Sequence, residues 1–348
     1  MRKLNGSQKR FYAQFARHGQ GDTLVEISPQ EVALLTAITH LDLHKNDVPE
    51  WLSQDLYLVS QKPFFEIGPN EISQLNIRTP EMAYDILMEA GIGNLDSPDY
   101  LYLTNLSALY RRRTKYLRIL RQQQFPSADQ IGPRCLLEYG NTDSSLLFSW
   151  MMWRKLTFDL DNRSAQETGY LFEPIVASCL GGVQMGSKNS VVHRLDAHGV
   201  PTNDGRQIDC YVEDTQKVYE LKMRMTIAAS GQGRFAEELS FPMEAQAAGL
   251  TPVLIVFDPT PSNRLTELQK AYANAGGESA TGDDAWDLLK NNAEVGMATF
   301  IEKYVEPPIN AAKTAIYGIP ESVTLEATEH CMTIAGNEKT YTILREHP

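Results

Sequence analysis

Several features that would place this chain in a familiar class are missing from its 348 residues. The four cysteines form no CxxC pair and no zinc-ligand spacing, so buried reduced thiols are expected and a disulfide scaffold is not. No run approaches the roughly 18 apolar residues of a membrane-spanning helix, and the N-terminus has no apolar signal region. There is no internal repeat. The sequence therefore predicts a soluble cytoplasmic protein without a membrane partner.

Positive charge is also scarce, because the net charge is −12. This argues against a generic nucleic-acid binder but not against a local basic surface. The stretch Ser97–Cys135 holds seven basic and two acidic residues. Its helical spacing places four basic residues on one stripe, with two interpretations: contact with DNA phosphates, or an ordinary solvated helix face. These four residues are Arg111, Lys115, Arg118 and Arg121.

Capping signals and hydrophobic periodicity give the elements that the sequence predicts. Helices are expected to begin after the cap residues Ser28, Thr79, Ser97 and Ser164. A buried helix is predicted at Ser144–Trp153 and a short strand at Tyr57–Val59. Further along the chain, the pattern predicts helices at Arg234–Ala248, Leu265–Ala275 and Asp283–Tyr304, a strand buried on both faces at Thr251–Asp258, and a hairpin around Gly336-Asn337.

The most informative stretch is Gly205–Met225, which alternates in two runs around a polar turn and reads as a β-hairpin. A turn centred on Asp214–Thr215 places Asp209 directly across from Glu220, on the same face. Lys222, two residues further on, shares that face. Like charges opposite one another are destabilising, so a divalent cation is the simplest compensation. The alternative is a solvent-facing hairpin in which Lys222 merely pairs with an acid.

The pattern Asp-x10-Glu-Leu-Lys resembles the catalytic hairpin of the PD-(D/E)xK nucleases, although Ile208 stands where that family usually has proline. The resemblance implies that Asp209 and Glu220 hold Mg²⁺, with Mn²⁺ as a substitute, and that Lys222 orients or activates the attacking water. Glu173 matches a further acid, on the helix before the hairpin, and is implied as a third metal ligand; a solvated helix face is its alternative. The segment Ile131–Gly140 and the site region resemble the ApaLI-like branch of restriction enzymes.

The fold implied is α/β, a mixed sheet flanked by helices of the restriction-endonuclease type, with a helical accessory region before it. We expect an accessory DNA-recognition region at 1–139, a catalytic core at 140–305 and an extension with a β-hairpin at 306–348. The function implied is that of a type II restriction endonuclease, which cuts double-stranded DNA at a specific, palindromic site and leaves 5′-phosphates. One hairpin site without a repeat predicts a homodimer. A repair or recombination nuclease and a non-catalytic DNA-binding protein remain alternatives.

Other residues are weaker candidates. Glu167 is explained by its capping position, and Glu244 and Gln246 could lie near the site. Residues in the loop before the hairpin and just after it are candidates for contact with a DNA groove. These are Lys188, Asn189, Arg194 and Arg224, with His193 equally explained as a surface histidine.

Overall fold

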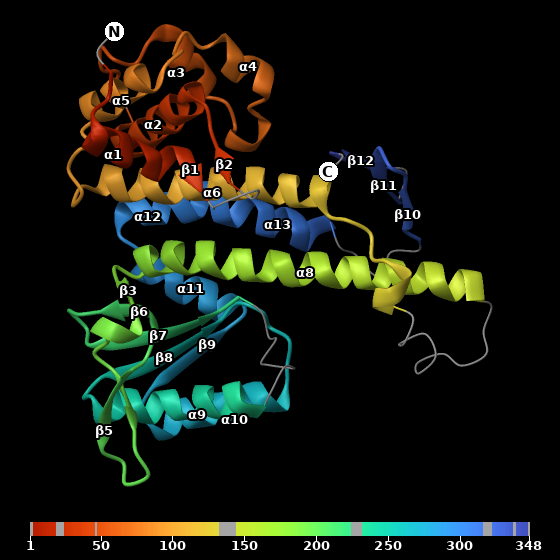
Figure 1. Cartoon of the computed structure of the whole chain (residues 1–348). Coiled ribbons are helices and arrows are strands. Elements are labelled where there is room, and N and C mark those ends of the chain that lie inside the picture. The colour runs from red at the N-terminus through yellow and green to blue at the C-terminus, as the bar shows by residue number, and fades with distance from the viewer. Residues whose placement is uncertain are drawn as a thin grey trace.

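The computed structural model describes residues 3–18, 24–45, 47–131, 144–223, 232–315, 322–336 and 339–346. Figure 1 shows a helical N-terminal region at one end, a twisted sheet at the other, and long helices running between them. No helix among these residues combines the length and apolar character needed to cross a membrane.

The N-terminal region is built from short helices packed around one buried helix, α2 (Pro29–His44), which begins with the predicted capping box of Ser28 and Glu31. Helices α5 (Pro80–Glu89) and α6 (Pro98–Gln122) start at their predicted caps. The strand predicted at Tyr57–Val59 is wrong, because this segment lies in α3 (Gln54–Ser60), whose cap Ser53 accepts a hydrogen bond from the Leu56 amide. The remaining elements are α1 (Gly6–Ala16), β1 (Arg17–His18), β2 (Val25–Glu26), η2 (Phe64–Glu66) and α4 (Pro69–Gln74).

Helix α8 (Ser144–Cys179) spans 36 residues and links the helical region to the sheet (Figure 1). The predicted helix at its start is present but is not buried throughout, since Leu146 is 73% and Trp150 is 53% exposed. The separate helix predicted to begin at Ser164 is wrong, because the helix continues through this point and the Ser164 carbonyl accepts a hydrogen bond from Arg112. It ends at Cys179, and Gly181 just beyond it takes a positive φ of 69°.

The sheet has five strands in the order β3-β6-β7-β8-β9. The first three pair antiparallel, and β7, β8 and β9 run parallel, so the predicted mixed α/β architecture is confirmed. Helices α8 and α11 (Asp283–Asn292) pack on one face of the sheet, and α9 (Gln232–Ala247) and α10 (Asn263–Asn274) on the other (Figure 1). The strands are β3 (Val183–Met185), β6 (Ile208–Val212), β7 (Lys217–Lys222), β8 (Thr251–Val256) and β9 (Glu278–Thr281).

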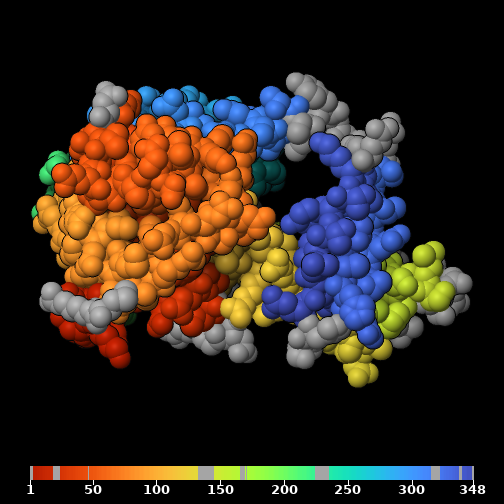
Figure 2. Space-filling view, turned by 90° about the horizontal axis from the view of Figure 1, so that it is seen from above, coloured from red at the N-terminus to blue at the C-terminus, as the bar shows by residue number. Residues whose placement is uncertain are grey.

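The C-terminal elements return to the helical region. The single helix predicted at Asp283–Tyr304 is interrupted after Asn292, where Ala293 and Glu294 are non-helical. The predicted C-terminal hairpin is confirmed and gains a third strand, so that β10, β11 and β12 form a small block beside the helices (Figure 2). These elements are α12 (Val295–Phe300), η4 (Ile301–Val305), α13 (Glu306–Ala315), β10 (Thr324–Ala327), β11 (Cys331–Gly336) and β12 (Lys339–Leu344).

Two hydrophobic clusters hold these layers together. The larger runs from the N-terminal helices through α8 to one face of the sheet, and the smaller fills the space between the other face and α9 and α10. Strand β8 contributes alternate residues to both, as expected of a strand that is buried on both sides. The sheet that carries the hairpin is therefore fixed from both faces, and the ends of its strands provide a rigid base for side chains.

Candidate active site

The hairpin β6–β7 has the predicted register. Cys210 pairs with Tyr219 and Val212 with Lys217, so the next step along the ladder sets Asp209 opposite Glu220. The Leu221 amide donates a hydrogen bond of 3.0 Å to Oδ2 of Asp209. The Asp209 carboxylate is thus held against β7 rather than turned toward solvent.

The Lys222 ammonium lies between two carboxylates, those of Glu220 and Glu238. Its Nζ lies 3.0 Å from Oε1 of Glu220 and 3.1 Å from Oε1 of Glu238, and its side chain is 14% exposed. Burial lowers the pKa of Lys222, but the carboxylates of Glu220 and Glu238 outweigh burial and raise it above its ordinary value. Lys222 is therefore a firmly protonated hydrogen-bond donor at neutral pH.

The acids of the site carry more negative charge than Lys222 can balance. Burial, followed by the charges of Glu220 and Glu173, raises the pKa of Asp209 well above its usual range. Burial and Glu220 also raise the pKa of Glu173, against the opposite effect of Lys222. Glu173 on α8 is thus coupled electrostatically to the hairpin, as a member of the same site would be.

Glu238 was not singled out from the sequence. It lies on α9, and its Oε2 is buried without a hydrogen-bond partner among the described residues. A signal was present: Glu238 stands three residues after Phe235 and three before Phe241, on the apolar face of a helix. A lone acid at a core position needs a partner, and Lys222 is that partner.

The weaker candidates from the sequence, Glu244, Gln246 and Glu167, are not placed in this charge cluster by the described residues. Glu244 is buried and pairs with Arg206, which also donates hydrogen bonds to the Glu237 carbonyl and to Ser240, so its charge is satisfied locally. Gln246 is exposed. The side chain of Glu167 lies outside the described residues.

A cavity of about 450 Å³ opens over the hairpin, lined by Asp209, Glu220 and Glu238. Arg194, on β4 (His193–Leu195), also lines the cavity and pairs with Glu237 at 3.2 Å. Lys188 and Asn189 are exposed on η3 (Ser187–Asn189), beside the cavity residue Ser187. His193 is partly buried, and its Nδ1 lacks a partner among the described residues. Strand β4 pairs with β5 (Pro201–Gly205), while Arg224 lies outside the described residues.

The basic residues predicted to form one stripe on α6 do not all face solvent. Arg111 and Lys115 are only 6% and 5% exposed, so the expectation of an outward-facing stripe is wrong at these two positions. Arg111 donates to the backbone carbonyls of Ser107 and Arg17, and burial lowers its pKa to about 10. Arg118 donates to the Leu24 carbonyl. The Arg121 side chain is 47% exposed, beside Glu346.

The candidate site is a cluster of partly buried carboxylates around one lysine on a mixed sheet, a set of side chains that can hold a cation. The comparisons with known proteins define the class. The family model of ApaLI-like restriction endonucleases matches residues 69–306, a range that includes all the acids discussed and Lys222. The type II restriction enzyme ApaLI of Acetobacter pasteurianus is 41% identical in an alignment of 292 residues, which covers 80% of this chain and 75% of that enzyme. No solved structure matches.

The chain belongs to the ApaLI-like restriction endonucleases, and is thus an enzyme that hydrolyses DNA at a specific site. This confirms the resemblance stated from the hairpin and from Ile131–Gly140, although most of that segment lies outside the described residues.

Proposed function

We propose that Asp209, Glu220 and Lys222, with Glu173, form the site at which this restriction endonuclease hydrolyses phosphodiester bonds of double-stranded DNA in the presence of Mg²⁺. The observation that carries the proposal is the excess of buried carboxylate charge around a single lysine. Within a protein core, such an arrangement is unfavourable unless a cation completes it. Family membership supplies the substrate class.

The residues present fit a magnesium ion. Asp209, Glu220 and Glu173 offer only oxygen ligands, which Mg²⁺ prefers, and Mn²⁺ accepts the same set. Burial first, and then the neighbouring carboxylates, raise the pKa values of Asp209 and Glu173, and a cation bound between these groups would oppose both effects. When bound, Mg²⁺ supplies charge neutralisation at the scissile phosphate and at the leaving oxygen.

The chain's own residues then have separate tasks. Lys222 is protonated, so it acts as a hydrogen-bond donor that orients the attacking water and binds a phosphate oxygen, rather than as a base. Glu220 and Glu238 fix the position of its ammonium from two sides. The water would form a bond to phosphorus while the P–O3′ bond breaks, and a proton released by the water ends on the leaving 3′ oxygen. The products are a 3′-hydroxyl and the 5′-phosphate that the family resemblance implies. Glu238 is in this account a positioning residue.

The sheet supports a finer assignment of the fold. We propose that helix α8, the strands β3, β6 and β7, helix α9 and strand β8 are a PD-(D/E)xK core. Support comes from their order, from the antiparallel pairing of β6 with β7, and from the parallel pairing of β7 with β8. We retain the division into a recognition region at 1–139, a core at 140–305 and an extension at 306–348.

Recognition of DNA would use residues around the cavity. Lys188 and Asn189 are exposed beside it and Arg194 lines it, and such side chains read base edges or bind phosphates. Arg224 follows Lys222 by two residues and stays a candidate, as does Arg121 on α6. The buried Arg111 and Lys115 are not proposed as phosphate contacts, and Arg118 is held by a backbone carbonyl.

We further propose that the enzyme acts in the cytoplasm as a homodimer. One chain carries one hairpin site, and cutting both strands of a palindromic target requires two sites related by a two-fold axis. Light scattering with and without DNA tests this, because a monomer in both states would remove the proposal.

Digestion of a long natural DNA tests the function itself. We expect discrete bands in Mg²⁺ and none in excess chelator. Cuts that depend on branches or nicks would instead indicate a repair nuclease, and binding without cuts would indicate a non-catalytic protein.

A further inference from the structure

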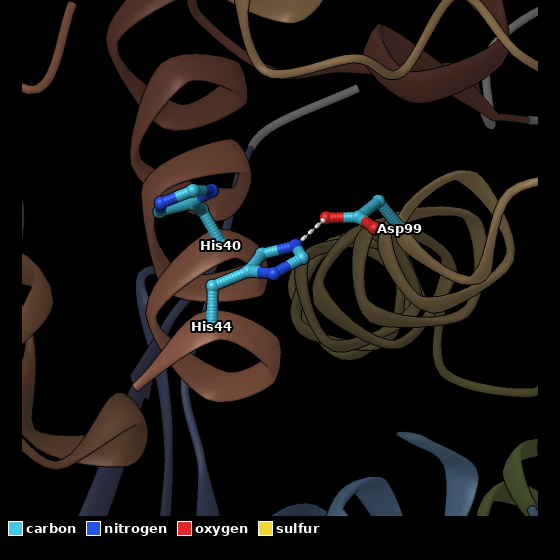
Figure 3. Close-up of side chains that lie close together, drawn as sticks. All are labelled: His40, His44 and Asp99. Carbon is cyan, nitrogen blue, oxygen red and sulfur yellow. Dashed lines mark hydrogen bonds and ion pairs between the residues drawn. The ribbon is translucent and has the colours of Figure 1, made fainter. Parts of the chain in front are cut away.

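A second cluster of metal-ligating side chains lies in the helical region, away from the hairpin. His40 and His44 stand four residues apart in the last turns of α2, so they share one face of the helix. Their ring centroids are 4.8 Å apart. Figure 3 shows His44 and Asp99 pointing toward each other from the two helices, with His40 one turn further along the helix that carries His44.

Asp99 completes the cluster from a different helix. It is the second residue of α6, two residues after the cap Ser97. Its Oδ1 lies 2.7 Å from Nε2 of His44, and its side chain is 15% exposed. One nitrogen of each histidine and one oxygen of Asp99 all lie within 4.8 Å of one another.

We propose that His40, His44 and Asp99 bind a Zn²⁺ ion that joins the end of α2 to the start of α6. Two imidazole nitrogens and one carboxylate oxygen are a ligand set that suits Zn²⁺ and not the harder Mg²⁺. Tetrahedral ligands about 2.0–2.2 Å from zinc stand about 3.3–3.6 Å apart. Separations that reach up to 4.8 Å must therefore close by up to about 1.5 Å, and the 2.7 Å contact between His44 and Asp99 must open. Side-chain rotation supplies this, because the His44 side chain is 45% exposed.

The fourth position of this site is open to water. A cavity of about 640 Å³ is lined by His44 and Asp99, which gives an ion access from solvent. The surroundings are favourable for a cation. Nε2 of His40 lies 3.6 Å from the Asp47 carboxylate and 3.2 Å from the Asp47 carbonyl, and Glu294 lines the same cavity as Asp99.

Ordinary contacts hold each member of the cluster. His44 pairs with Asp99, and His40, whose side chain is only 10% exposed, contacts Asp47 through Nε2 and packs against His44. These contacts do not require one nitrogen of each ring and one oxygen of Asp99 to converge within 4.8 Å, and a shared ion accounts for that convergence. Because none of these residues belongs to the hairpin site, this zinc would stabilise the helical region and take no part in hydrolysis.

Metal titration of the untagged full-length chain tests the proposal. The parent protein is the Asp209→Asn variant, which removes a ligand of the candidate magnesium site, after treatment with chelator and desalting. Calorimetric titration with Zn²⁺ is expected to give one equivalent. Co²⁺ in its place should develop the visible absorption of a tetrahedral site with nitrogen and oxygen ligands. We expect Zn²⁺ to raise the unfolding temperature of this parent, because binding favours the folded state.

Two further variants locate the ion. His44→Gln and Asp99→Asn, each added to the parent, should weaken Zn²⁺ binding at least tenfold and remove both the Co²⁺ spectrum and the rise in unfolding temperature. His198→Gln, at an exposed histidine between β4 and β5, is the matched control and should change nothing. Circular dichroism verifies folding, and each of the two variants answers the question alone if the other fails to fold. Absence of saturable binding in the parent, or unchanged affinity in His44→Gln and Asp99→Asn, would overturn the proposal.

Discussion

Two regions of this molecule bury charge, and they do so in opposite ways. On α6, Arg111 and Arg118 direct their guanidinium groups at backbone carbonyls of their own chain, near the β1–β2 hairpin. On the β6–β7 hairpin, the carboxylates of Asp209 and Glu220 crowd around Lys222 with charge left over. Buried charge that is satisfied within the chain is structural, whereas buried charge that lacks its counter-charge indicates a ligand. The comparison assigns stability to α6 and chemistry to the hairpin.

The largest effect should come from removing the hairpin charges. We expect Asp209→Asn and Lys222→Ala to lower the rate of DNA cleavage by about 10³-fold or more, because each removes a group that acts on the transition state. Circular dichroism should show an unchanged fold. Lys217→Ala is the matched control, since Lys217 begins the same strand but pairs with the exposed Glu278. If Lys222→Ala cleaved DNA at the rate of the unsubstituted chain, Lys222 would have no catalytic role.

Removing the metal should separate binding from chemistry at the hairpin. We expect chelator to stop cleavage and added Mg²⁺ or Mn²⁺ to restore it, because the acids require a cation between themselves and a phosphate. Ca²⁺ should support binding of specific DNA without cleavage. Gel-shift and cleavage assays on the same samples measure both. Full activity in excess chelator would exclude the metal-dependent mechanism.

Glu238 offers a graded test of how the hairpin lysine is held. Glu238→Gln keeps the shape but removes one of the two charges that fix Lys222, so we expect kcat to fall about 10- to 100-fold with little change in KM. The loss of activity at alkaline pH should begin at a lower pH in this variant, because Glu238 raises the pKa of Lys222 and burial lowers it. Glu237→Gln, one residue earlier on α9 and paired with Arg194, is the control for the pH profile. Equal profiles for the two variants would remove the positioning role.

A substitution of Arg111 tests whether the buried charge of α6 is structural. Arg111→Met should lower the free energy of unfolding by about 2 kcal/mol, because it leaves the partly buried Arg17 carbonyl without its side-chain donor. The salt dependence of DNA binding should not change, since a buried guanidinium neutralises no phosphate. Denaturant unfolding and a salt series measure the two quantities. A shallower salt slope with unchanged stability would return Arg111 to the DNA surface.

The sequence predicted the hairpin well and the α6 stripe poorly, for a physical reason. The register of Asp209 and Glu220 follows from local alternation and a short turn, so it needs no knowledge of the rest of the chain. Burial of Arg111 depends on strands β1 and β2, which are far away in sequence and lie on α6 only after folding. The continuous helix through Ser164 shows the same limit, because a capping pattern has no effect where the helix has already begun.

Glu238 is an intermediate case. Its position on the apolar face of a helix could be read from Phe235 and Phe241, but its partner Lys222 could not, because the contact joins two different elements, β7 and α9, and becomes visible only in three dimensions. The parts of the site within one hairpin were thus accessible to sequence. Glu173 on α8 was accessible only through the family resemblance, and Glu238 on α9 depended on tertiary packing.

The smallest expected effect concerns stability, and it has the opposite sign to the effect on catalysis. The pKa of Asp209 is raised in the folded protein, so the folded state holds its proton to higher pH than the unfolded chain does. Between the ordinary aspartate pKa of about 3.9 and the raised folded value, the stability of the folded protein therefore falls as pH rises.

The Asp209→Asn substitution removes this loss of stability, and the asparagine can keep a hydrogen bond from the Leu221 amide. In the absence of metal at pH 7, we expect the unfolding temperature of Asp209→Asn to be about 2 °C higher than that of the unsubstituted chain. This difference should disappear toward pH 4. Asp204→Asn, at an exposed position on β5, is the control. Added Mg²⁺ should raise the unfolding temperature of the unsubstituted chain and leave that of Asp209→Asn nearly unchanged. If Asp209→Asn were less stable than the unsubstituted chain at pH 7, this would contradict the excess of negative charge on which the site assignment rests.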